Sequence, residues 1–414
     1  MEKLIVYPIG KPNLKDEKEM LIGAYWCPIP TEKAYSYVAE SGITHMLVNT
    51  MIGHEREDKG YYLKPFLLAK KHGVKIVMHC MDKGYNNVKE YAEIFKLQDN
   101  FAGVLAKDEP ETPDYPFFVE DYKDFKKDFP SLPYYVNLFP IYSSKEQMKA
   151  ESYEIYLNEY VEKVLKSYRD GDRALMCDCY PLLVENRLHP RWLKNLEMLR
   201  AACDQTGADL YLYLQSQGFC EMWRQPKTVR ELTFQMYVNM CYGVKGLLHY
   251  PYRTPMNTPS EFPASVRYNG RKTYMFELVK EMNEELKAID GTYLEFKWQA
   301  VVKSVGNLSE LKNENFENAK DLKDGYGALK GVVSEHDAIV GCFTNDEGYQ
   351  AFLVVNFTEP LDNQNNVVKL KLDGMDGAVV HIKDKKETIK VADGILNLEL
   401  KSGSGAFVIP FKNK

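Results

Sequence analysis

Residues 101–110 read FAGVLAKDEP, and this stretch decides the fold. It begins with six small or apolar residues, which is the composition of a buried strand in a parallel sheet. Lys107, Asp108 and Glu109 follow, and Pro110 ends the strand because proline has no N–H to donate. Two adjacent carboxyl groups are therefore predicted at the C-terminal end of a buried strand, where parallel α/β proteins carry their chemistry.

Stretches of this kind recur along the first 291 residues, and each is followed by a segment of helical character. The expected strands are residues 21–27, 45–50, 74–80, 101–110, 134–138, 174–179, 209–215 and 244–250. The expected helices are residues 32–41, 61–72, 87–97, 116–129, 152–168, 190–206, 228–242 and 271–289. Eight strand–helix units in about 270 residues predict an α/β fold, a (β/α)₈ TIM barrel with parallel strands. A doubly wound open sheet would more often carry a Gly-rich fingerprint after its first strand, and none is present.

The pattern changes near residue 292. Short strands with alternating apolar residues are expected at 300–304, 338–344, 350–356, 367–372, 378–382, 395–400 and 405–410. Turns rich in Asp, Asn and Gly separate them, which is typical of an antiparallel β-sandwich. We therefore predict a catalytic barrel at residues 1–291 and a C-terminal sandwich at residues 292–414 that supports the flank of the barrel.

Composition narrows the class of protein. The net charge of −6 and the lack of a basic stripe argue against a nucleic-acid partner. No apolar run is long enough for a signal peptide or a membrane span, so we expect a cytoplasmic protein without a membrane partner. The eight cysteines are mostly surrounded by apolar residues and fit reduced core positions. Cys177 and Cys179 form a CxC. A second cysteine pair is lacking nearby in the sequence, so a zinc site is not expected.

Polar and aromatic side chains end each of the eight predicted strands. In chain order they are Tyr25 and Trp26, Asn49, His79, Asp108 and Glu109, Asn137, Asp178 and Tyr180, Gln215 and Gln217, and His249 and Tyr250. In a closed barrel these strand ends meet on one face. Buried polar groups cost free energy unless they are paired, so stability alone does not explain such a concentration.

The chemistry of this set favours a sugar. It contains carboxylates, neutral amides, histidines and aromatic rings but few cations, so it is poorly suited to phosphate. Sugar hydroxyl groups need donors and acceptors, and sugar C–H faces stack on Trp and Tyr. Glycoside hydrolysis in addition needs two carboxyl groups beside the scissile bond.

Several of these segments resemble barrel glycoside hydrolases of the clan that carries its acid/base Glu at the end of strand four. The segments are KDEP (107–110), YVNL (135–138), DCYP (178–181), GLLHY (246–250) and the helix and strand start at 226–246. The resemblance covers the barrel and, more loosely, a C-terminal sandwich of the kind found in bacterial members. It implies that Glu109 is the general acid and that the protein is a glycosidase, with no cofactor or metal.

One position departs from the clan. The clan carries its nucleophile, a Glu, at the end of strand seven, whereas this chain reads Gln215-Ser216-Gln217 there and places Glu221 several residues later. The next carboxylate at a strand end is Asp178, which we expect to act as general base or, alternatively, as nucleophile. Asp108 would hold a sugar hydroxyl group or raise the pKa of Glu109.

Two other functions stay open from the sequence. One is a carbohydrate-binding barrel that has lost catalysis, since the strand-seven carboxylate is missing. The other is a metal-assisted hydrolase or lyase that uses His79, Glu109, Asp178 and His249, although no HxH or HExxH spacing supports it.

Overall fold

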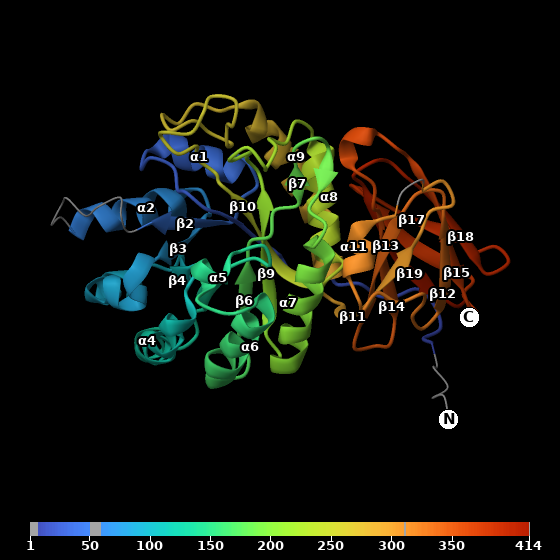
Figure 1. Ribbon diagram of the computed structural model, residues 1–414, viewed down its shortest axis with the longest axis horizontal. Coiled ribbons are helices and arrows are strands. Elements are labelled where there is room, and N and C mark those ends of the chain that lie inside the picture. Colours follow the sequence, from blue (N-terminus) through green and yellow to red (C-terminus); the bar gives the residue numbers. More distant parts are fainter. Residues whose placement is uncertain (1–6, 50–58, 310–311, 414) are drawn as a thin grey trace.

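The structure is a computed structural model that describes residues 7–49, 59–309 and 312–413. A closed barrel of eight parallel strands forms its larger part, and two antiparallel sheets form the rest (Figure 1). Around the barrel the strand order is β1-β10-β9-β6-β5-β4-β3-β2, which is the order of the chain once the small β7–β8 hairpin is set aside. The predicted (β/α)₈ barrel followed by a β-sandwich is confirmed.

The barrel strands lie where the apolar runs predict them. They are β1 (Leu21–Ala24), β2 (His45–Asn49), β3 (Lys75–His79), β4 (Phe101–Asp108), β5 (Tyr134–Leu138), β6 (Ala174–Cys177), β9 (Asp209–Gln215) and β10 (Val244–Tyr250). Strands β5, β9 and β10 match the predicted bounds, whereas β1, β4 and β6 end earlier because the chain turns over the mouth of the barrel. Thr50, the last residue of the second predicted strand, lies outside the described residues.

Helices follow the strands and form the outer layer. They are α1 (Glu32–Glu40), α2 (Lys59–Lys71), α3 (Ala92–Lys96), α4 (Tyr115–Asp128), α5 (Lys145–Met148), α6 (Tyr153–Lys163), α7 (Trp192–Thr206), α8 (Val229–Met240), α9 (Tyr274–Lys287) and α10 (Asp290–Tyr293). Short 3₁₀ turns accompany them at η2 (Met81–Asn87), η3 (Lys89–Tyr91), η4 (Thr112–Asp114) and η5 (Leu165–Ser167). Among the described residues, no helix is both long and apolar enough to cross a membrane.

The prediction of a helix at residues 87–97 is largely wrong. The chain forms η2 and η3 there and only five residues of α-helix. Gly84 interrupts the segment with a φ of 57°, and the Asp121 carboxylate accepts the backbone N–H groups of Tyr85 and Asn86. The Asp121 side chain of α4 thus fixes the backbone just before the predicted helix.

The sandwich consists of a six-stranded sheet, β11-β13-β14-β19-β16-β17, and a three-stranded sheet, β12-β15-β18. The bounds are β11 (Lys297–Ser304), β12 (Leu329–Ser334), β13 (Ala338–Thr344), β14 (Gln350–Asn356), β15 (Asn366–Leu372), β16 (Gly377–Ile382), β17 (Lys385–Lys390), β18 (Ile395–Leu400) and β19 (Gly405–Phe411), with α11 (Glu314–Asn318) and η6 (Pro360–Asp362) between them. The sequence analysis misses β12 and β17. Strand β17 reads KKETIK and has no buried residue, so it lacks the alternation that reveals a strand.

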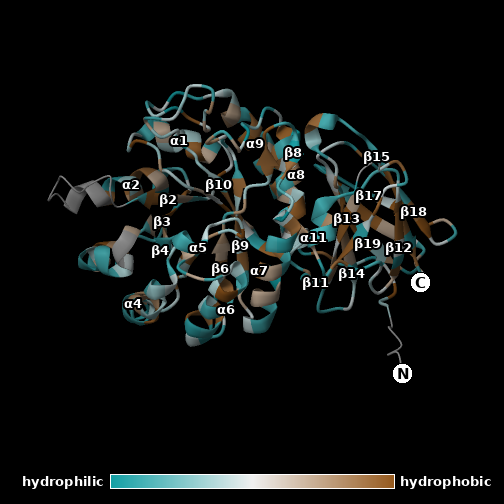
Figure 2. Cartoon of the chain, in the orientation of Figure 1, coloured by the Kyte–Doolittle hydropathy of each residue, from teal (hydrophilic) through white to brown (hydrophobic). Residues whose placement is uncertain are grey.

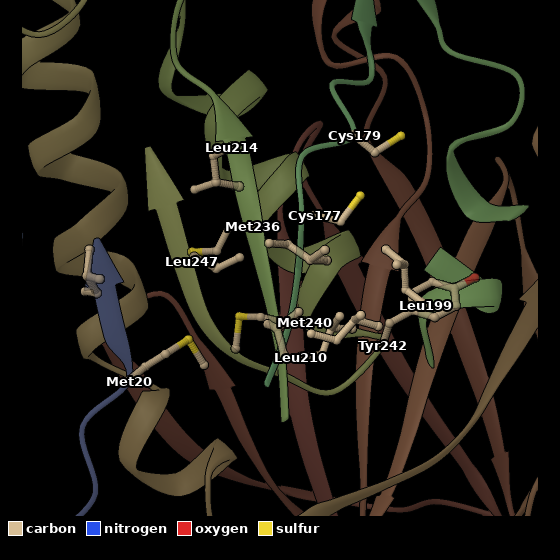
Figure 3. Close-up of a cluster of buried hydrophobic side chains, with 14 of the residues drawn as sticks. Met20, Cys177, Cys179, Leu199, Leu210, Leu214, Met236, Met240, Tyr242 and Leu247 are labelled. Carbon is tan, nitrogen blue, oxygen red and sulfur yellow. The ribbon is translucent and has the colours of Figure 1, made fainter. Parts of the chain in front are cut away.

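Apolar residues form three clusters. Figure 2 colours the hydrophobic residues brown along the chain. One fills the barrel interior, one fills the sandwich, and the largest lies between barrel strands and helices and continues into the sandwich. Figure 3 shows part of the largest cluster, with Cys177 and Cys179 among Leu210, Leu214 and Met236. These two cysteines are core residues, as predicted, and all eight cysteines are free thiols.

Hydrogen bonds join the barrel and the sandwich. The Trp298 side chain donates to the Cys241 carbonyl oxygen (2.9 Å), and the Thr233 hydroxyl group of α8 donates to the Gly403 carbonyl oxygen (2.7 Å). The sandwich therefore rests on α8, the helix that follows β9. The exact boundary after residue 291 stays a prediction.

Candidate active site

A cavity of about 170 Å³ lies at the C-terminal ends of the barrel strands. Nine residues line it: Tyr25, Asp108, Glu109, Asn137, Asp178, Tyr180, Tyr213, Phe219 and Tyr250. They come from β4, β5, β9 and β10 and from the segments that follow β1, β4, β6 and β9. Three of these residues have a carboxyl group, one has an amide and five are aromatic, and none is Lys, Arg or His.

Strand β4 brings two consecutive carboxyl groups to this cavity. Successive side chains of a regular strand point to opposite faces, so Asp108 and Glu109 need a local irregularity to share one side. The register of β4 against β5 shifts between Leu105 and Lys107, and Glu109 has a φ of 49°, in the left-handed region. The Glu109 N–H donates to the Asn137 carbonyl oxygen (2.8 Å), which holds this unusual conformation in place.

Asn137 joins two carboxyl groups. Its side-chain nitrogen donates to Asp108 Oδ1 (2.8 Å) and to Asp178 Oδ1 (2.9 Å). The second oxygen of Asp108 accepts a hydrogen bond from the Tyr25 hydroxyl group (3.2 Å). Residues of β1, β4, β5 and the end of β6 are thus connected into one network beneath the mouth of the barrel.

Glu109 and Asp178 hold protons more tightly than free carboxylic acids do. Burial raises the pKa of Glu109 to about 7, and the charge of Asp108 adds to this effect. Burial also raises the pKa of Asp178 well above its usual range, as do the charges of Glu109 and Asp108, while hydrogen bonds from Asn137 and Tyr180 oppose the shift. Near neutral pH the site therefore holds at least one transferable proton.

Aromatic rings form the wall of the cavity. The Tyr250 ring lies 5.6 Å, centroid to centroid, from both Tyr25 and Tyr180, and Tyr180 lies 5.2 Å from Phe219. Phe219 in turn stacks on Trp223 at 4.9 Å. Burial raises the pKa of Tyr250 to about 12, so this hydroxyl group stays neutral.

Seven of the thirteen residues predicted for the site line the cavity. They are Tyr25, Asp108, Glu109, Asn137, Asp178, Tyr180 and Tyr250. Three further predicted residues lie near it without lining it. Trp26 packs edge-on against Tyr25, with ring centroids 6.1 Å apart; the His79 ring lies 5.3 Å from Tyr25; and Asn49 pairs with His79 in register across β2 and β3.

His249 is a correction to the predicted site. Along β10, Leu248 and Tyr250 point into the barrel, so His249 points outward between the strand and α9. One ring nitrogen lies 2.8 Å from the Ser216 hydroxyl group and the other 2.9 Å from Asn283 Oδ1. Burial lowers the pKa of His249 to about 4, so it is a neutral residue of the core.

Gln215 and Gln217 also do not line the cavity. The Gln215 amide accepts from the Leu182 N–H and donates to the carbonyl oxygens of Leu182 and Arg224, so its side chain fixes two loops. The Gln217 amide donates to the Phe262 carbonyl oxygen (2.7 Å). Glu221, the later carboxylate in this loop, is exposed and does not line the cavity either.

The residues that a metal-assisted reaction would need are not brought together. His249 faces α9, whereas Glu109 and Asp178 face the cavity. Within residues 7–49, 59–309 and 312–413, no group of three or more His, Cys, Asp or Glu side chains has a geometry that could hold a metal ion. The donor set at the strand ends does not fit a bound metal.

Tyr213 and Phe219 line the cavity but are absent from the predicted site. Tyr213 shares the inward face of β9 with Tyr211, so counting in twos along the predicted strand would have found it. Phe219 lies in the loop after β9, whose path the sequence does not reveal. Two larger cavities, of about 280 and 320 Å³, lie between α7 and β11 and beside α1, away from the strand ends.

No protein-family model and no curated protein matches this sequence. Among solved structures, the chain is similar to the β-galactosidase from Bacillus circulans sp. alkalophilus, with a TM-score of 0.58 and 9% identity over 96% of this chain and 100% of that one. It is also similar to the β-galactosidase from Rahnella sp. R3, with a TM-score of 0.53 and 10% identity over 76% of this chain. This chain spans 62% of the length of the Rahnella enzyme. At such identities the similarity is one of fold alone.

Proposed function

We propose that this protein is a glycosidase that uses Glu109 as general acid and Asp178 as its partner carboxyl group. The observation that carries this proposal is that both groups line one aromatic-walled cavity at the C-terminal face of the barrel, where burial raises the pKa of Glu109 to about 7. A glycosidase needs a carboxyl pair of this kind, one member holding a proton at neutral pH. The glycosidase fold of the structural neighbours supports the same reaction class.

In the proposed reaction the proton of Glu109 passes to the glycosidic oxygen as the bond to the anomeric carbon breaks. Asp178 then acts in one of two ways. As a base it takes a proton from water while the water oxygen bonds to the anomeric carbon; as a nucleophile it forms a glycosyl ester that water later hydrolyses. Asp108 keeps Glu109 protonated through its charge and holds Asn137 in place.

The size of the cavity favours a single sugar residue. Its volume of about 170 Å³ is below the roughly 300 Å³ at which typical ligand pockets begin. We infer that the enzyme accepts the terminal residue of a glycoside.

All eight cysteines are free thiols, which supports the expected cytoplasmic location.

The test compares wild type with Glu109→Gln and Asp178→Asn on α- and β-glycosides. Each variant should lose about 10²–10⁴-fold in kcat/KM on substrates with poor leaving groups. Glu109→Gln should lose much less on nitrophenyl glycosides, because nitrophenolate leaves without a proton. Full activity of Glu109→Gln on unactivated glycosides contradicts the proposal.

Glu120→Gln is the matched control for this test. Glu120 is exposed on α4 and pairs with Lys123, so the substitution removes the same charge away from the cavity. Its activity should equal that of wild type.

A carbohydrate-binding protein without catalysis is the second candidate. The observation that favours it is the amide of Gln215 where related enzymes carry a nucleophile, buried and fully used by Leu182 and Arg224. Binding of sugars without any product after prolonged incubation would support this candidate over the glycosidase.

A further inference from the structure

The cavity has one more carboxyl group than hydrolysis requires. A glycosidase needs two carboxyl groups, and Asp108 is a third. Both Asp108 oxygens accept hydrogen bonds from the cavity wall, one from Tyr25 and one from Asn137. No cation among the nine lining residues balances these groups.

Two acceptor oxygens in the wall are also left without a donor. Asn137 Oδ1 and the Tyr213 hydroxyl oxygen are buried and have no hydrogen-bond partner among the described residues. Asn137 uses its nitrogen for Asp108 and Asp178, so its oxygen can be satisfied only from another direction. A buried polar atom without a partner is costly, and both residues line the cavity. The Asn137 oxygen can only accept, so it favours a ligand that donates a hydrogen bond, whereas the Tyr213 hydroxyl group can donate or accept.

The aromatic rings of the wall also favour a positively charged ligand. The Tyr250 ring lies between those of Tyr25 and Tyr180, with centroids 5.6 Å from each. Phe219 lies next to Tyr180. The face of an aromatic ring attracts a cation, more strongly when the site is shielded from water.

We propose that the sugar bound in this cavity carries a protonated amino group. The proposal rests on the proposed function only in placing the sugar in the same cavity. An ammonium group has three donors and no acceptor, which complements the Asp108 carboxylate and the unpaired Asn137 oxygen. The same wall disfavours uronic acids and sugar phosphates, because nothing in it pairs with an anion.

A simpler explanation assigns the third carboxyl group, Asp108, to the transition state, in which the sugar ring itself becomes positive. The two explanations differ for a ligand that does not react. If Asp108 serves only the transition state, a stable amino sugar should bind hardly more tightly than its neutral parent. Equilibrium binding therefore distinguishes the two explanations.

The experiment is calorimetric titration of the wild-type protein at about pH 7 with free hexoses. The probes are the 2-amino-2-deoxy and 6-amino-6-deoxy forms of glucose, galactose and mannose, each beside its neutral parent and its N-acetyl form. At least one amino hexose should bind about tenfold or more tightly than both neutral counterparts. If no amino hexose binds better than its parent, the proposal is overturned.

Two variants locate the effect. Asp108→Asn keeps the shape of the side chain and removes its charge, and should reduce the preference for the amino sugar severalfold. Asp209→Asn removes one exposed carboxylate at the opposite end of β9, outside the cavity, and should leave the preference intact. An equal loss in both variants would contradict a site in the cavity. The wild-type comparison decides the proposal even if Asp108→Asn does not fold.

This result is separable from the proposed function. Hydrolysis of neutral glycosides with no preference for an amino sugar overturns the inference and leaves the glycosidase standing. Selective binding of an amino sugar with no hydrolysis of any glycoside, amino glycosides included, supports the inference and removes the glycosidase.

Discussion

Two sides of the barrel mouth use polar side chains in opposite ways. On the β4–β6 side, Asp108, Glu109 and Asp178 line the cavity together with Asn137. On the β9–β10 side, Gln215 and His249 end strands in the same way, yet both are directed into protein contacts. We call the first group the acidic side and the second pair the neutral side.

The difference shows that the position of a residue at a strand end does not decide what it does. His249 follows the pleat of β10 outward to Asn283, and Gln215 is covered by the segments that carry Leu182 and Arg224. Arg224 is itself fixed by ion pairs to Glu231 of α8 and to Glu359 of the sandwich. The neutral side thus anchors the loops, while the acidic side is open to a ligand.

The largest effect is expected when a carboxylate is placed on the neutral side. Gln215→Glu introduces the residue type that the clan resembled by this sequence carries at the end of strand seven. Here it should destabilise the fold by about 3–5 kcal/mol, because the new side chain cannot donate to the Leu182 and Arg224 carbonyl oxygens and its charge is buried without a partner. Urea unfolding measures this loss.

The control for that substitution is Gln364→Glu on the exposed surface of the sandwich, which should change stability very little. If Gln215→Glu is as stable as wild type and more active, the division into an acidic and a neutral side is wrong.

A smaller effect, of about 1–3 kcal/mol, is expected in the pH dependence of stability, with opposite signs on the two sides. The pKa of Glu109 is about 7 when folded and 4.5 ordinarily, so stability is lost as pH rises from about 4.5 to 7. The pKa of His249 is about 4 when folded and 6.5 ordinarily, so stability is lost as pH falls from about 6.5 to 4. The loss of stability at rising pH should be absent from Glu109→Gln, and the loss at falling pH should be absent from His249→Gln. Urea unfolding across this pH range measures both.

Each variant serves as the control for the other, because neither substitution alters the group that the other removes. If both variants shift the pH dependence in the same direction, the protonation states assigned to the two sides are wrong.

Much of the fold could be predicted from the sequence, and the reason lies in its apolar runs. Strands β5, β9 and β10 are buried along their length, so their bounds are visible in composition. Strand β17 and the segment 81–97 could not be predicted. The strand is polar except for Ile389, and the segment contacts Asp121, a residue distant in sequence.

The candidate site was predictable where strand geometry alone places a side chain. Asp178 and Asn137 line the cavity as expected for strand ends, and Tyr213 could have been added by counting in twos. The same counting would have removed His249. Gln215 and Phe219 depend on the path of loops, which no local pattern of the sequence records.

The most direct test of the central claim is the pH dependence of kcat/KM for wild type on an unactivated glycoside. Glu109 must be protonated to act as general acid, so activity should fall as pH rises, with a midpoint near 7, and this decline should be absent from the residual activity of Glu109→Gln. Wild-type activity that stays constant from about pH 6 to about pH 9 would contradict the assignment of Glu109.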